Sequence, residues 1–225
     1  MKRISEVELG RILSSAPNLK DLKYTYAWYP MANMRPTPAG TLDLATLRAS
    51  LEGHRLELEK LELLVLDDAA VLEEPEGDSV RPIRLEGSRL ELHDFSNLRI
   101  LTAPWVLIAG PSKGEHPSPL RYLIPKSVVQ LTLTDDLFQQ PYWDWNNEEI
   151  WETLSNYLHD VKETNAALDA MFLVGPRLSN MFDDQVLQIV RGFARFSGVS
   201  LWTVELTVDD RDALRDAEER ARRYG

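Results

Sequence analysis

The chain has 225 residues, with 25 Lys and Arg against 36 Asp and Glu and a formal net charge of −11. This balance disfavours nucleic acids and anionic membranes as partners, because both carry negative charge. The absence of cysteine excludes disulfides, thiolate metal ligands and a cysteine nucleophile. No apolar run approaches the roughly 20 residues of a membrane span, and the first residues lack a signal-peptide pattern, so we expect a cytoplasmic or nuclear protein.

Helical patterns recur along the chain. The first predicted helix covers residues 5–15, with Ser5 as its N-cap, and a second begins at Asp43. The apolar face of the first would be formed by Val7, Ile12 and Leu13, with Leu9 at its edge, and that of the second by Leu44, Leu47 and Leu51. Two further helices are predicted over about 147–163 and 182–196, and a charged helix over 207–225 would cap the C-terminal end.

Between these helices, short segments place apolar residues at positions 1, 4 and 6. The clearest is Val128–Asp136, in which Val128, Leu131 and Leu133 would point inward while Gln130, Thr132 and Thr134 face the other side. Similar segments begin at Leu19, Leu61, Leu98, Leu168 and Leu201. The inward residues expected in the second and sixth segments are Leu61, Leu64 and Leu66, and Leu201, Val204 and Leu206.

This recurring LxxLxL pattern is typical of leucine-rich repeats, whose strands turn those three residues into a solenoid core. The six segments begin 30 to 42 residues apart, whereas regular repeats run about 20–29 residues. The sequence therefore predicts one α/β domain over 1–225, an irregular leucine-rich-repeat solenoid of about six units. Its curved parallel sheet would follow chain order, with helices or loops on the convex side. An ordinary α/β domain with similar-looking strands is the alternative.

Three phrases of the sequence resemble the leucine-rich-repeat portion of fungal F-box-type proteins. They are Pro17-Asn18-Leu19-x-x-Leu22, Asp94-Phe95-x-x-Leu98-x-x-Leu101 and Leu123-x-Pro125-x-Ser127-Val128-x-x-Leu131. The resemblance implies a substrate receptor in ubiquitin ligation, whose repeats hold the target protein. Because no F-box-like segment precedes the first repeat, we expect the substrate-recognition part of such a receptor without its F-box.

If the apolar triplets face inward, the residues between them form an exposed sheet face. That face would be mostly uncharged and partly apolar in an acidic chain, as protein-binding surfaces are. We therefore predict a non-enzymatic scaffold that binds another protein. The predicted partner-binding residues are Val65, Asp67, Ile100, Thr102, Gln130, Thr132, Phe172, Val174, Thr203 and Glu205. The alternative is that the face is covered, which would make Val65, Ile100 and Phe172 part of the core.

Three pairs of aspartates each follow a predicted strand: Asp67-Asp68, Asp135-Asp136 and Asp209-Asp210. Aligned in a solenoid, they could form an acidic ridge for a basic partner or a loose divalent cation site. We favour a simpler interpretation, in which aspartate suits strand ends and turns because it hydrogen-bonds the local backbone.

The segment 141–151 is rich in aromatic and acidic residues. Trp143-Asp144-Trp145 could line the cleft of a hydrolase or of a carbohydrate-binding protein, in which two carboxyl groups act as acid and base. The same aromatics could instead anchor a protein interface. A third interpretation, which we favour, is a loop tucked under the next helix, with Asn146 or Asn147 as its cap and Glu149 in its first turn.

No motif supports metal, cofactor or catalytic chemistry. Nucleotide-binding loops and hydrolase signatures are missing from the sequence. The histidines do not have metal-ligand spacing; they are His54, His93, His116 and His159. We accordingly predict no metal, no cofactor and no catalytic residue.

Overall fold

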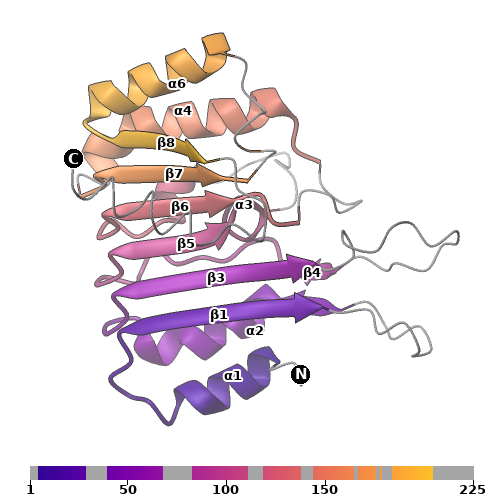
Figure 1. Cartoon of the computed structure of the whole chain (residues 1–225). Coiled ribbons are helices and arrows are strands. Elements are labelled where there is room, and N and C mark those ends of the chain that lie inside the picture. Colours follow the sequence, from indigo (N-terminus) through magenta and orange to yellow (C-terminus); the bar gives the residue numbers. More distant parts are fainter. Residues whose placement is uncertain are drawn as a thin grey trace, which may run out of the picture.

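A six-stranded parallel sheet with helices on one side organises the structure (Figure 1). This computed structural model describes residues 5–28, 40–67, 83–110, 119–137, 144–164, 167–175, 178 and 184–204. One hydrophobic cluster runs between sheet and helices from Leu9 to Val199. Within the described ranges, no helix is long and apolar enough to cross a membrane.

The sheet contains β1 (Asp21–Trp28), β3 (Lys60–Asp67), β5 (Ile100–Pro104), β6 (Gln130–Thr134), β7 (Ala170–Val174) and β8 (Ser200–Val204). They lie side by side in that order, and every pair is parallel. The predictions of an α/β fold and of six parallel strands in chain order are confirmed. A small parallel pair, β2 (Thr41–Asp43) and β4 (Arg84–Glu86), was not anticipated from the sequence.

The helices are α1 (Glu6–Leu13), α2 (Leu44–Leu51), α3 (Trp105–Ala109), α4 (Asn147–Thr164) and α6 (Asp184–Ser197), with short 3-10 turns at Glu52–His54 and Leu120–Tyr122. Four of the five match predicted helices. The short α3 was not predicted, because it directly follows β5 inside a run of apolar residues. The predicted capping helix over 207–225 lies outside the described residues.

The first helix is rotated relative to the predicted orientation. Val7 and Ile12, expected to be buried, are 55% and 51% exposed, whereas Leu9 and Leu13 are buried. Leu9 and Leu13 are four residues apart and therefore share a face. Gly10 fixes which face of α1 is turned toward α2, because the two helices approach closely there. A Cβ added at Gly10 would lie 2.8 Å from the hydroxyl oxygen of Ser50 in α2. This close approach of α1 to α2 turns Val7 and Ile12 outward. The predicted cap is confirmed: Ser5 accepts from the N–H of Glu8 at 3.2 Å and belongs to a capping box.

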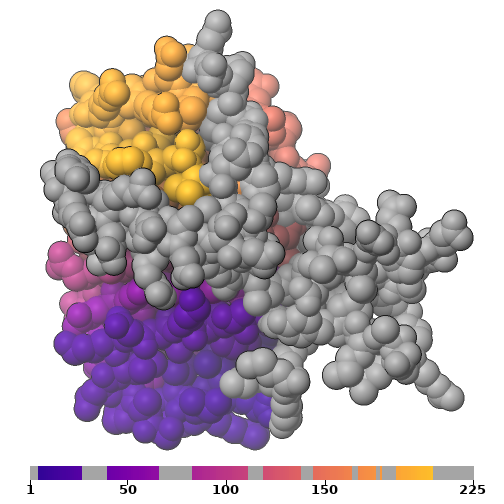
Figure 2. Space-filling view, viewed as in Figure 1, coloured from indigo at the N-terminus to yellow at the C-terminus, as the bar shows by residue number. Residues whose placement is uncertain are grey.

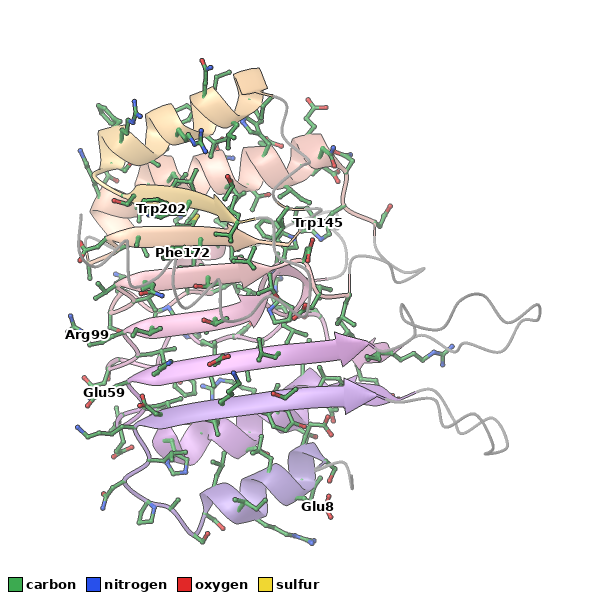
Figure 3. The ribbon with its side chains drawn as sticks, viewed as in Figure 1. Glu8, Glu59, Arg99, Trp145, Phe172 and Trp202 are labelled. Carbon is green, nitrogen blue, oxygen red and sulfur yellow. The ribbon has the colours of Figure 1, made fainter. Side chains whose placement is uncertain are left out.

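Each of the first four strands of the sheet begins at a backbone carbonyl that accepts two N–H groups from the start of the next strand. The carbonyl of Lys20 accepts from Glu59 and Lys60 at 2.8 and 2.9 Å, and that of Glu59 accepts from Arg99 and Ile100 at 2.8 and 3.1 Å. The same arrangement recurs at the carbonyls of Arg99 and Val129. We call this set the carbonyl ladder; Glu59 and Arg99 mark its end of the sheet in Figure 3. These hydrogen bonds join the start of each of these strands to the start of the next strand in the sheet.

Strand pairing corrects the register predicted for two segments. The row of aligned core residues is Leu22, Leu61, Leu101, Leu131, Met171 and Leu201. Leu61 and Leu201 therefore stand at the second apolar position, and the predicted registers were wrong by three residues. The inward triplet of this segment is Leu58, just before β3, with Leu61 and Leu63 in the strand; each of the three side chains is at most 1% exposed. The run 58–66 is so rich in leucine that it holds two such triplets, and only pairing with the neighbouring strands selects one.

We expect Leu131→Ala to cost about 2–5 kcal/mol of unfolding free energy, because it leaves a cavity in the middle of the core. Leu131 is fully buried in the central strand β6. Val129→Ala is the matched control, since that side chain is only half-buried at the start of the same strand. Urea denaturation measures both. Equal losses would contradict the assigned core face.

The cap of α2 makes stability depend on pH. The Asp43 carboxylate accepts from the Thr46 hydroxyl at 2.5 Å and from the N–H groups of Ala45 and Thr46 at 2.9 and 3.1 Å. These hydrogen bonds, the Thr46 hydroxyl foremost, lower the pKa of Asp43. A carboxyl with a lower pKa when folded stabilises the protein above its unfolded pKa of about 3.9, and this contribution is lost as pH falls through the folded value.

Asp43→Asn should therefore keep a capped helix and flatten the acid end of the stability curve, whereas Asp43→Ala should cost about 0.5–2 kcal/mol at neutral pH. Urea midpoints measured between pH 2.5 and 7 test both effects. Identical acid dependence of the wild type and Asp43→Asn would refute the role assigned to the carboxylate.

Candidate functional site

The candidate site is the side of the six-stranded sheet that faces away from the hydrophobic cluster, which we call the open face. No described helix lies on it; the helices are on the other side (Figure 1). Strand pairing aligns its central row as Lys23, Glu62, Thr102, Thr132, Phe172 and Trp202. The row nearer the carbonyl ladder is Asp21, Lys60, Ile100, Gln130, Ala170 and Ser200.

Six of the ten predicted partner-binding residues lie on the open face: Ile100, Thr102, Gln130, Thr132, Phe172 and Val174. Val65 and Thr203 do not. Val65 belongs to the hydrophobic cluster, and Thr203 is aligned with the core residue Leu173. Each lies on the core side, because successive side chains of a strand alternate between faces and an odd register error reverses them. The side chain of Asp67 and all of Glu205 lie outside the described residues.

Solvent exposure varies across the open face. Thr132 and Phe172 at its centre are fully buried, and Thr102 is 5% exposed. At the two edges, Asp21, Lys23 and Thr25 of β1 are exposed, and Trp202 of β8 is 39% exposed. Figure 2 shows the first and last units, in indigo and yellow, at the surface in this view. These values fit the alternative in which Phe172 is buried, and they leave the two edges of the face accessible.

The β1 edge is charged but locally neutral. Lys20 pairs with Glu59 at 2.6 Å, and Lys23 pairs with its cross-strand neighbour Glu62 at 2.5 Å. The hydrogen bond and charge of Glu59 raise the pKa of Lys20. Exposed pairs of this kind contribute little stability. Their main effect is to give this edge an ordered, alternating charge pattern that a polar partner surface could match.

The β8 edge is aromatic. The rings of Phe172 and Trp202 stack with centroids 6.4 Å apart and planes 14° apart (Figure 3). Beside them are two buried polar atoms without a hydrogen-bond partner among the described residues, the hydroxyl of Thr132 and Nε2 of Gln130. Similar atoms occur elsewhere in the described residues, such as Nε1 of Trp105 and the hydroxyl of Ser155, so these two do not by themselves distinguish the region.

The aspartates after β6 bind the protein's own backbone. Pairing between β3 and β5 stops at Glu62 and Thr102. Further along β3, the N–H of Val65 donates to the carboxylate of Asp136 at 3.3 Å, and the hydroxyl of Thr134 donates to it at 3.0 Å. Asp136 thus accepts from the backbone of a distant strand, whereas the sequence interpretation expected the local backbone. In the described part of the chain, no three His, Asp or Glu side chains are grouped to hold a metal ion.

The described part of the aromatic segment 141–151 is structural. Trp145 is buried, its ring N–H donates to the carbonyl of Gly110 at 2.9 Å, and it meets Trp105 edge-on with centroids 5.3 Å apart. Asn146 and Glu149 form a reciprocal cap on α4, with hydrogen bonds of 2.9 and 3.1 Å. The favoured interpretation of a loop tucked under a helix is therefore confirmed for this part. Trp145 offers no free ring face for a sugar; Trp143 lies outside the described residues, and Asp144 is exposed.

A hollow of about 530 Å³ lies on the helix side, lined by Ala45, Arg48, Ala49, Glu52, Glu91 and His93. Its one arginine is already engaged. Arg48 donates to both carboxylate oxygens of Asp94 at 2.7 Å, to Glu52, and to the carbonyl of Glu91 at 2.7 Å. It also lies 4.9 Å from the ring centroid of Phe95. The arginine of this hollow therefore links neighbouring segments of the chain and is not free to bind a ligand.

Sequence reasoning missed the open-face residues of β3 and β8, among them Glu62, Leu64 and Trp202. All follow from the two register errors, since the predicted triplets placed Leu64 inside and left Trp202 unassigned. A usable signal was present: the correct β3 triplet begins at Leu58, which is 39 residues after Leu19 and 40 before Leu98. That nearly even spacing favours the true register.

Comparisons with known proteins do not classify the chain. No family model, no curated protein and no solved structure matches it. Any function must therefore be argued from the arrangement of its own residues.

We expect Gly175→Ala to destabilise the protein by about 1–3 kcal/mol, the usual cost of a strained backbone. Gly175, just after β7, has φ +115°, and an added Cβ would lie 1.9 Å from a carboxylate oxygen of Asp135. Adding Asp135→Ala should recover part of the loss by removing the clash. Gly192→Ala in α6 is the control, because its Cβ would meet nothing within 4 Å. Thermal melts that rank Gly192→Ala below Gly175→Ala would contradict this account.

Proposed function

We propose that this protein is a non-enzymatic scaffold of the irregular leucine-rich-repeat type, and that it binds another protein through the open face. The carbonyl ladder supports the repeat assignment, because the same two-bond arrangement occurs at four successive strands. The phrases that resemble F-box-type proteins supply similar contacts between units. The hydroxyl of Ser127 donates to the carbonyls of Phe95 and Leu98 at 3.1 and 2.8 Å, and the Asn97 side chain donates to the carbonyl of Leu56.

The single observation that carries the binding proposal is the composition of the central row of the open face. It runs from the ion pair Lys23–Glu62 at one edge to the stacked rings of Phe172 and Trp202 near the other. Protein interfaces combine aromatic anchors with a polar rim in this way. Trp202 is the accessible anchor, because its ring is part exposed and is held in place by Phe172.

The size of the open face limits the kind of partner. Six strands spaced about 4.8 Å apart span about 24 Å, and five residues along a strand span about 17 Å. The whole face would cover roughly 400 Å², about half of what each partner contributes to a standard interface. The burial of Thr102, Thr132 and Phe172 reduces the accessible area further, to the two edges. We therefore propose that the β8 edge, where Trp202 is exposed, takes a polypeptide segment of the partner. The resemblance to F-box-type receptors favours a ubiquitin-ligation target as that partner, and this part stays a prediction.

The test compares wild type with Trp202→Ala as affinity baits in extracts of the source organism, with quantitative mass spectrometry as the readout. We expect the specific partner to be depleted about tenfold or more by Trp202→Ala, the usual effect of losing an aromatic anchor. Tyr122→Ala is the matched control: its ring is 58% exposed, but it lies in the 3-10 turn that packs on α4, away from the open face. Phe172 and Val65 are unsuitable positions, since both are buried.

Thermal melts of the two variants show whether a lost partner reflects an unfolded bait instead of a lost contact. Depletion by Trp202→Ala with an unchanged melting temperature supports the open face as the binding surface. A partner that is retained by Trp202→Ala, or lost equally with Tyr122→Ala, refutes it. Recovery of ubiquitin-ligase subunits in the wild-type sample would test the F-box relation separately.

A further inference from the structure

The outer side of α6 carries an exposed apolar stripe. Ile189 and Phe196 are 49% and 69% exposed, and they are seven residues apart, so they lie on the same side of the helix, two turns apart. Between them is Gly192, where an added Cβ would meet nothing within 4 Å. The stripe therefore has two apolar ends and a notch where a second backbone can approach closely.

Positive charge surrounds this stripe although the chain is acidic. Arg191 and Arg195 are exposed on α6, and neither forms an ion pair with a described residue. Lys162 of α4 lies with its Nζ 4.7 Å from the ring centroid of Phe196. Glu163 adds one exposed carboxylate in the last turn of α4. Three cations against one carboxylate make this a local basic site in a chain of net charge −11.

The other exposed apolar side chains in the described ranges do not form a comparable surface. Val7 and Ile12 lie on either side of the buried face of α1, because they are five residues apart. Leu56 and Tyr122 belong to different turns, and Arg121 lies over the Tyr122 ring. Among the residues that the structure describes, exposed apolar side chains, a notch and unpaired cations coincide only on α6.

We propose that this side of α6 is a docking site for an amphipathic helix of a partner protein, one whose apolar stripe is bordered by acidic residues. The partner's apolar side chains would pack on Ile189 and Phe196, with its backbone crossing at Gly192. Its carboxylates would pair with Arg191 and Arg195. Charge complementarity selects this occupant, since a basic helix would be repelled by the same cations. The site is separate from the open face, because α6 lies on the helix side of the sheet (Figure 1).

The test uses two synthetic helical peptides of about 18 residues, or five turns, as probes. Both carry leucines at i, i+3, i+4 and i+7; one has glutamates at most other positions, and the other has lysines. Fluorescence anisotropy measures binding to the full-length protein. We expect only the glutamate peptide to bind, with an affinity that falls as salt is raised. Arg191→Glu combined with Arg195→Glu, and separately Phe196→Ala, should each weaken binding about tenfold or more.

The matched control combines Arg99→Glu with Lys126→Glu. It makes the same change in net charge at exposed positions just before β5 and in the turn before β6, and we expect it to leave the affinity nearly unchanged. The proposal fails if both charge-reversal doubles weaken binding equally, if the lysine peptide binds as well, or if neither peptide binds. Binding to anionic phosphatidylserine vesicles in place of the glutamate peptide would also overturn it, by making the surface a membrane contact. Circular dichroism confirms that every variant is folded.

Discussion

The carbonyl ladder at the start of the strands is the interaction on which the rest of the structure depends. At Lys20, Glu59, Arg99 and Val129, one carbonyl accepts two N–H groups from the following unit. Each such junction fixes how far the next strand is displaced along the sheet. The intervening chain, whether a full helix such as α4 or a short turn such as 120–122, only has to return to that point. Units of unequal length can therefore share one sheet.

The strand register set by the ladder decides which side chains are interior. With Leu61 aligned to Leu22 and Leu101, β3 places Leu63 and Val65 in the hydrophobic cluster and Leu64 on the open face. A displacement of three residues would exchange the two faces of that strand. The position of Glu62 on the open face and the burial of Leu61 in the core both follow from this one register. Packing then selects details such as the orientation of α1, where Gly10 admits Ser50.

The two surfaces proposed for binding arise from opposite sides of this arrangement. The open face is an ordered array of strand side chains, charged at β1 and aromatic at β8. The stripe on α6 exists because this helix packs on α4 and β8 with one side and has no described neighbour on the other. If both proposals hold, the protein would hold two partners at once, on opposite sides of the sheet.

The sequence by itself determined the features that depend on neighbours a few residues apart. These include the six strands, the cap at Ser5, the choice of Asn146 or Asn147 as the cap of α4, and the buried faces of α2 and α4, because helical periodicity and capping are local. Tertiary structure alone decided the register of β3 and β8, and with it the positions of Val65, Thr203 and Trp202. It also decided the burial of Phe172 and the bond from Trp145 to Gly110, 35 residues away. Such features depend on which strand or loop lies alongside, and a leucine-rich run offers several pairings of similar local energy, among which only the packed structure selects.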